Sequence, residues 1–110
     1  MVAERDIVRV SREVFDELDR VLGSERGGDG APSVNDFLTI DLLPIVDVFA
    51  SRFDHLPEAV RGRSDYRLLI TSGALVHGVA VIGQRTIDGT IELVYIRLDL
   101  EPYWGDDDPA

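Results

Sequence analysis

Apolar side chains in the first part of the chain recur at the spacing of an α-helix. Over residues 4–22 they fall three, four and seven positions apart, which places them in one stripe. Glu4 and Asp6 occupy the first turn, where the helix dipole favours negative charge, and Gly23 follows as a left-handed cap. We therefore predict an amphipathic helix over residues 4–22. The stripe consists of Ile7, Val8, Val14, Phe15, Leu18, Val21 and Leu22.

A second helix is predicted after a glycine-rich connection. Residues 23–33 contain four glycines and a proline but no large apolar side chain, so we expect a flexible loop there. The helical period resumes over residues 42–55, with Asp41 as its N-cap and Pro44 in the first turn, where proline is tolerated. Residues 34–40 fit either a helical turn capped by Ser33 or a short extended segment.

The period then changes from 3.6 to 2, which indicates β-strands. We predict strands over residues 66–71, 74–82 and 90–100. Turns are expected at Ser72-Gly73 and at Asp88-Gly89, the second being a typical hairpin signal. Such short connections between consecutive strands favour an antiparallel meander.

These elements predict a two-layer α+β domain. Two N-terminal helices would pack on a three-stranded antiparallel β-meander, in the order ααβββ. A chain of 110 residues is long enough for one core, so we assign residues 1–104 to a single domain. Residues 105–110 contain three consecutive aspartates, and we expect them to form an acidic disordered tail.

One face of this sheet is expected to stay uncovered. The predicted strand 74–82 is apolar on both sides, whereas two helices cover only one. An exposed apolar patch of this kind marks a contact with another protein or with a second copy. Strands 66–71 and 90–100 are predicted to be sheet edges, which can also pair with another chain. We predict the interface residues to be Leu75, Val79, Val81, Ile91, Leu93 and Tyr95.

Composition narrows the possible functions. The chain has a net charge of −10, and this negative charge argues against nucleic acid as a partner. It has no cysteine, which excludes disulfides and thiolate metal sites. Every basic residue is arginine, as is typical of proteins from GC-rich bacteria. No apolar run is long enough to cross a membrane and no signal peptide is recognised, so a cytoplasmic location is expected.

The charge is not evenly spread along the chain. Arg61, Arg63, Arg67 and Arg85 lie within 25 residues that contain only one acidic residue, Asp65. Such a basic region can bind an anion or an acidic partner, or its arginines can pair with carboxylates of the same protein.

No catalytic or metal-binding arrangement is visible. The two histidines, His55 and His77, lie outside any nucleophile motif and lack the spacing of a zinc site. We therefore predict no cofactor and no metal, and favour a protein that is not an enzyme.

One stretch resembles a known family. Residues 56–85 contain LPEAVRGRSDYRLLI followed by LVHGVAVIGQR. They are similar to the Gly/Arg loop, the Tyr-Arg-aliphatic strand and the next Arg-ending strand of the RelE/ParE-type toxin superfamily of bacterial toxin–antitoxin systems. The resemblance implies that arginines hold phosphate in an RNA-cleaving site, while a tyrosine transfers a proton or stacks on a base. The residues it assigns are Arg61, Arg63, Arg67, Arg85, Tyr66 and Tyr95.

Taken together, these features favour a small protein–protein interaction or regulatory module that self-associates as a homodimer through its sheet. Two alternatives stay open. One is a RelE/ParE-like toxin fold, either an active or a degenerate ribonuclease. The other is an acidic mimic of nucleic acid that occupies a basic site on another protein.

Overall fold

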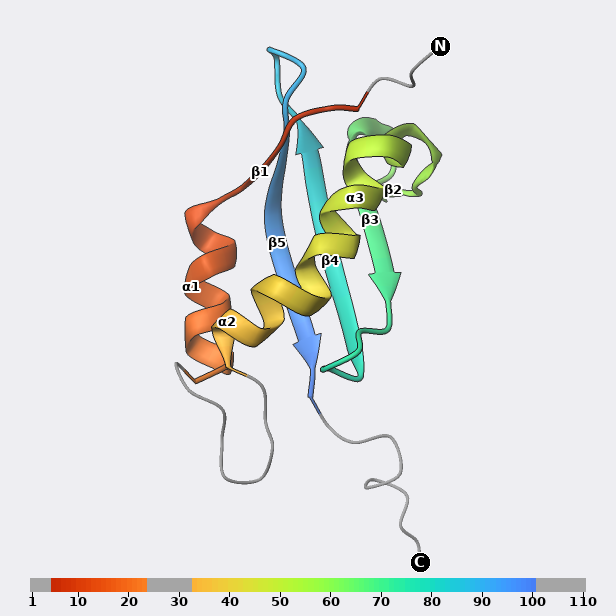
Figure 1. Cartoon of the computed structure of the whole chain (residues 1–110). Coiled ribbons are helices and arrows are strands. Elements are labelled where there is room, and N and C mark those ends of the chain that lie inside the picture. The colour runs from red at the N-terminus through yellow and green to blue at the C-terminus, as the bar shows by residue number, and fades with distance from the viewer. Residues whose placement is uncertain (1–4, 24–32, 101–110) are drawn as a thin grey trace, which may run out of the picture.

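A computed structural model describes residues 5–23 and 33–100 (Figure 1). The first half contains a short strand and the helices, and the second half contains the remaining strands. In chain order the elements are β1 (Val8–Val10), α1 (Arg12–Val21), α2 (Val34–Asp36), the π-helix η1 (Phe37–Asp41), α3 (Leu42–Arg52), the 3-10 helix η2 (Phe53–His55), β2 (Glu58–Val60), β3 (Arg63–Thr71), β4 (Gly78–Arg85) and β5 (Ile91–Asp99).

The strands form one five-stranded mixed sheet in the order β1-β5-β4-β3-β2. Strands β2 to β5 are antiparallel to their neighbours, whereas β1 is parallel to β5. Helix α1 and the joined helix α2–η1–α3 pack on the same face of the sheet (Figure 1). The α+β class is therefore correct, but the predicted three-stranded antiparallel meander under two helices is wrong. A short strand extends the sheet on each side.

The first of these strands, β1, replaces the start of the predicted helix over 4–22. Ser11 is the N-cap, because its backbone is extended and its hydroxyl accepts a hydrogen bond from the Val14 N–H at 3.4 Å. Before Ser11, Val8 and Val10 alternate with Arg9 and pack on the core. The Ser11 N–H donates to the Leu93 carbonyl at 3.0 Å, which fastens this segment to β5. The helix therefore begins at Arg12.

The second helix begins earlier than predicted. Ser33 and Asp36 form a reciprocal capping box, so residues 34–40 are helical, one of the two open alternatives. Asp41 is not an N-cap, because it has helical dihedral angles and makes no capping hydrogen bond. In the π turn, the Leu42 N–H donates to the Phe37 carbonyl. This wider turn directly precedes Pro44, which a regular helix interior would accommodate poorly.

The second extra strand, β2, was not expected from the sequence. It forms a hairpin with β3 through a turn at Gly62, whose φ of +82° favours glycine. The Gly62 N–H donates to Glu58 Oε1 at 3.0 Å. Because β2 and β1 flank the sheet, the prediction that strands 66–71 and 90–100 are its edges is wrong.

The core lies between the helices and one face of the sheet. Phe49 of α3 packs directly on Gly83 of β4, where an added Cβ would lie only 2.7 Å from the Phe49 Cε1. This contact fixes which face of β4 the helices cover. The largest fully buried side chains are Phe37, Phe49, Leu18, Ile91, Leu93, Val14 and Val81.

A β-bulge at Val94 interrupts the alternation along β5. Leu93 pairs with Gly83 and Tyr95 pairs with Ile82, so Val94 is the extra residue. Leu93 and Ile96 are both buried on the helix side, whereas Tyr95 is exposed. A strict two-residue period therefore cannot assign both halves of β5 correctly, and it places Ile91 and Leu93 on the wrong face.

A buried carboxylate holds the connection between β3 and β4. Asp41, only 4% exposed, accepts backbone hydrogen bonds from Ala74 at 2.7 Å, Leu75 at 2.9 Å and Val76 at 3.2 Å. Gly73 packs against the same side chain, and a Cβ there would lie 2.8 Å from the Asp41 Cγ. This one side chain therefore joins the long helix to the end of the sheet where β3 stops.

The predicted loop over 23–33 lies mostly outside the described residues, as does the predicted tail over 105–110. At the two described ends of the loop, Gly23 and Ser33 form a bridge, and the Val34 N–H donates to the Gly23 carbonyl at 2.9 Å. Within the described ranges, no helix combines the length and the apolar character needed to cross a membrane.

Candidate interaction surface

The sheet face opposite the helices, here called the open face, is organised in three rows across β3, β4 and β5. Directly paired residues of neighbouring strands share a face, so the register gives the rows. The rows are Tyr66–Gln84–Glu92, Leu68–Ile82–Tyr95 and Ile70–Ala80–Arg97. The middle row is entirely apolar or aromatic.

Apolar side chains of the open face are accessible to solvent. Ile70 is 71% exposed and Tyr95 is 46% exposed, while Leu68, Ala80 and Ile82 are half-buried. These five side chains are neighbours within two adjacent rows, and we call them the apolar patch. Large side chains left accessible together in this way are typical of a surface that contacts another protein.

Charges around the apolar patch alternate in sign. On the β1 side, Arg9 pairs in register with Glu92. Along β5, Arg97 precedes Asp99 by two residues on the same face, and both are exposed. The open face therefore has no strong net charge of its own, although the whole chain carries −10.

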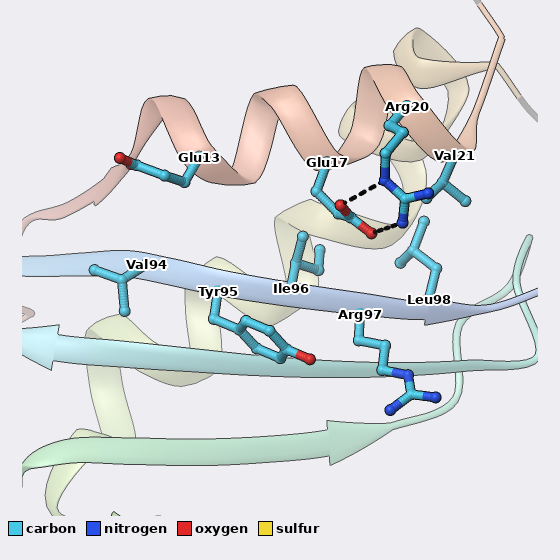
Figure 2. Close-up of a pocket in the computed structure, with 9 residues that line it drawn as sticks. All are labelled: Glu13, Glu17, Arg20, Val21, Val94, Tyr95, Ile96, Arg97 and Leu98. Carbon is cyan, nitrogen blue, oxygen red and sulfur yellow. Dashed lines mark hydrogen bonds and ion pairs between the residues drawn. The ribbon is translucent and has the colours of Figure 1, made fainter.

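A groove of about 380 Å³ borders the open face between α1 and β5. Figure 2 shows Glu17 and Arg20 of α1 paired at its rim, with Tyr95 and Arg97 on the β5 side. Arg20 donates to Glu17 at 3.0 and 2.6 Å, and this hydrogen bonding lowers the pKa of Glu17 and raises that of Arg20. The groove extends the open face toward α1.

The structure corrects the predicted interface residues. Val79, Val81, Ile91 and Leu93 are buried at 2% exposure or less under the helices, so they belong to the core and not to the open face. Leu75 lies in the β3–β4 connection and packs partly against the same core. Only Tyr95 lies on the open face, because the Val94 bulge reverses the alternation. The residues that sequence reasoning missed are Leu68, Ile70, Ala80 and Ile82.

Two arginines of the predicted RNA-cleaving set stabilise the fold near Phe53. The Arg67 guanidinium donates to the backbone carbonyls of Leu56 at 2.7 Å and Asp54 at 3.2 Å. The Arg85 guanidinium lies 4.8 Å from the Phe53 ring centroid and pairs with Asp6 at 3.4 Å and Asp54 at 3.5 Å. Both side chains therefore contact groups of the same chain on the helix side of the sheet.

The other four members of that set lie elsewhere. Arg63 pairs with Asp65 at 2.9 Å and stacks over the Tyr66 ring at 4.8 Å, while Arg61 is exposed in the β2–β3 turn. Hydrogen bonding to Asp65 raises the pKa of Arg63 and lowers that of its partner. Tyr66 and Tyr95 lie in different rows of the open face. The six residues are thus divided between the two faces of the sheet and one turn.

The histidines are both at the surface. His55 ends η2, and His77 lies immediately before β4 rather than inside a strand. Among the described residues, no cluster of three or more His, Cys, Asp or Glu side chains is arranged to hold a metal ion.

Comparisons with protein-family models, with curated proteins and with solved structures found no match for this chain. The functional argument therefore depends on the geometry of the open face.

Proposed function

We propose that this protein is an interaction module that self-associates through the open face of its sheet. The observation that carries the proposal is the apolar patch of Leu68, Ile70, Ala80, Ile82 and Tyr95, which no helix of the described chain covers. Burying this patch against a second copy removes its apolar surface from water, a gain of about 25 cal/mol for each Å².

The charge distribution favours a second copy as the occupant. Two molecules of net charge −10 repel each other, so self-contact requires a surface where this repulsion is weakest. The open face provides Arg9 beside Glu92 and Arg97 near Asp99. A two-fold arrangement allows these opposite charges of one copy to face those of the other.

The salt dependence distinguishes this proposal from an acidic mimic of nucleic acid. Binding of an acidic surface to a basic protein weakens steeply as salt screens the attraction. Contact between two like-charged molecules through an apolar patch responds in the opposite way, because salt screens their repulsion. Self-association that strengthens with salt therefore supports the module.

The arginine contacts make ribonuclease activity the weaker alternative. Arg67 and Arg85 are engaged with carbonyls, carboxylates and the Phe53 ring. Binding a phosphate would require them to give up these contacts. In a ribonuclease, positively charged groups converge on the charge that develops in the transition state.

Sedimentation velocity over a concentration series tests the proposal. We expect the wild-type chain to change from monomer to dimer as concentration rises. Ile82→Glu places a carboxylate at the centre of the apolar patch and should weaken association at least 30-fold, about 2 kcal/mol.

Ile87→Glu is the matched control. Ile87 is fully exposed in the turn between β4 and β5, outside the open face, so the same added charge there should leave association nearly unchanged. A wild-type chain that stays monomeric at every accessible concentration contradicts the proposal. Equal weakening by the two variants also contradicts it, because the effect would then come from net charge alone.

A further inference from the structure

The open face is hollowed at the end of the sheet where β3 and β5 both stop. A depression of about 460 Å³ lies there, with Ile70 of β3 on one side and Arg97 and Asp99 of β5 on the other. Between them β4 contributes Gly78 and Ala80, which have little or no side chain, and Val79, which is buried at 2% exposure. The depression therefore has an apolar wall, a flat floor, and one cationic and one anionic side chain, Arg97 and Asp99, at its rim.

The chain leaves β5 beside this depression. Asp99, the last residue of β5, lines it, and Leu100 follows at 39% exposure. The next ten residues, EPYWGDDDPA, include Tyr103 and Trp104, which is the only tryptophan of the chain. Four residues of extended chain reach about 13 Å. Two strand spacings, from β5 to β3, measure about 10 Å. The length of the segment therefore allows the two rings to reach Ile70.

The chemistry of this segment matches the depression. An aromatic ring packs well on the exposed Ile70 side chain and the flat surface at Gly78 and Ala80. The aromatic pair is followed by Asp106, Asp107 and Asp108, whose charge is opposite to that of the exposed Arg97 guanidinium at the rim. Apolar contact therefore favours this occupant, whereas the attraction to Arg97 is partly offset by the Asp99 carboxylate at the same rim.

We propose that residues 101–110 dock in this depression, with Tyr103 and Trp104 on Ile70 and Ala80. Docking occupies one end of the apolar patch, so the segment competes with the second copy for the open face. The competition depends on the proposed self-association, whereas the docking itself does not. If the segment occupies the depression of each copy nine-tenths of the time, both copies must release it before they associate, so their apparent affinity is about a hundredfold weaker.

Trp104 reports its own environment, because no other tryptophan contributes to the emission. Measurements on the full chain at a concentration where sedimentation shows only monomer exclude contact with a second copy. We expect blue-shifted emission with protection from acrylamide quenching in the wild type. Ile70→Glu should move the emission to that of an exposed indole and remove the protection. Ile87→Glu, the remote control, should leave both unchanged.

Sedimentation of a Tyr103→Ser/Trp104→Ser double variant tests the competition. We expect it to self-associate about a hundredfold more tightly than the wild type, because the competing segment is removed from both copies. Emission typical of an exposed indole in the monomeric wild-type chain, unaltered by Ile70→Glu, overturns the docking. Equal association of the double variant and the wild type overturns the competition but leaves the proposed function intact. Absence of association in both chains contradicts the proposed function, while the emission still tests docking separately.

Discussion

Replacing Asp41 should show how much one buried carboxylate contributes to stability by holding the connection between β3 and β4. Asp41→Ala removes the acceptor of three backbone N–H groups in the connection between β3 and β4. Ala74 and Leu75 are partly accessible, so water can replace the carboxylate there, whereas the bond to the Val76 N–H is buried. The variant therefore leaves at least one buried donor without an acceptor.

The magnitude follows from these three bonds. A hydrogen bond to a charged group contributes about 1.5–3 kcal/mol, and an unsatisfied buried donor costs about 1–3 kcal/mol. Relief from burying the carboxylate offsets part of this loss. We expect the free energy of unfolding to fall by about 2–4 kcal/mol, measured by urea denaturation followed by circular dichroism. Asp41→Asn should lose less, because its amide oxygen can still accept from the Leu75 and Val76 N–H groups, while its NH₂ faces the partly accessible Ala74 N–H.

A double-mutant cycle with Gly73 tests the reasoning further. Gly73→Ala places a Cβ 2.8 Å from the Asp41 Cγ, so it should destabilise the wild type by about 1–3 kcal/mol. In the Asp41→Ala background that conflict is removed, and we expect a coupling energy of at least about 1 kcal/mol. A loss below about 0.5 kcal/mol for Asp41→Ala, or additive effects of the two changes, would refute this account of the connection.

Three further outcomes are expected. Gly83→Ala should destabilise the fold by about 1–3 kcal/mol in urea denaturation, because its Cβ meets the Phe49 ring; a neutral effect would contradict the assigned packing. Hydrogen bonds from Thr86 and Thr90 lower the pKa of Asp88 to about 2. The stability that the Asp88 carboxylate contributes is therefore complete above about pH 4 and is lost as the pH falls toward 2. An NMR titration of Asp88 with a midpoint near its ordinary 3.8 would disprove this. Arg85→Ala should cost about 1 kcal/mol of stability, and neither it nor the wild type should arrest growth on expression; arrest by the wild type alone would favour the ribonuclease alternative.

The helices and three main strands could be predicted because their patterns are local. Leu18 and Phe49 follow a helical period, and the Asp88-Gly89 turn marks its hairpin. The two outer strands, each three residues long, have no such pattern. Val8 and Val10 alternate correctly, but Val8 also belongs to the predicted helical stripe, and only the cap at Ser11 separates strand from helix.

The sequence could predict that one face of the sheet is uncovered, but it could not predict which residues lie on that face. A strand that is apolar on both sides, such as β4, gives no local sign of which side the helices cover. That choice depends on a long-range contact, the Phe49 ring on Gly83. The bulge at Val94 then places Tyr95 on the opposite face of the sheet from Leu93. The position of the bulge depends on the pairing of β4 with β5 rather than on β5 alone.

Cysteine scanning of the open face tests the central claim most directly, because the chain contains no cysteine of its own. In a two-fold contact, a residue near the axis meets the same residue of the second copy. A disulfide then forms when the two Cα atoms lie within about 7 Å. Single cysteines at Leu68, Ala80, Ile82 and Tyr95 are compared with Ile87→Cys under mild oxidation. We expect at least one open-face position to give a covalent dimer much faster than Ile87→Cys. Crosslinking no faster than this control at all four positions would contradict self-association through the open face.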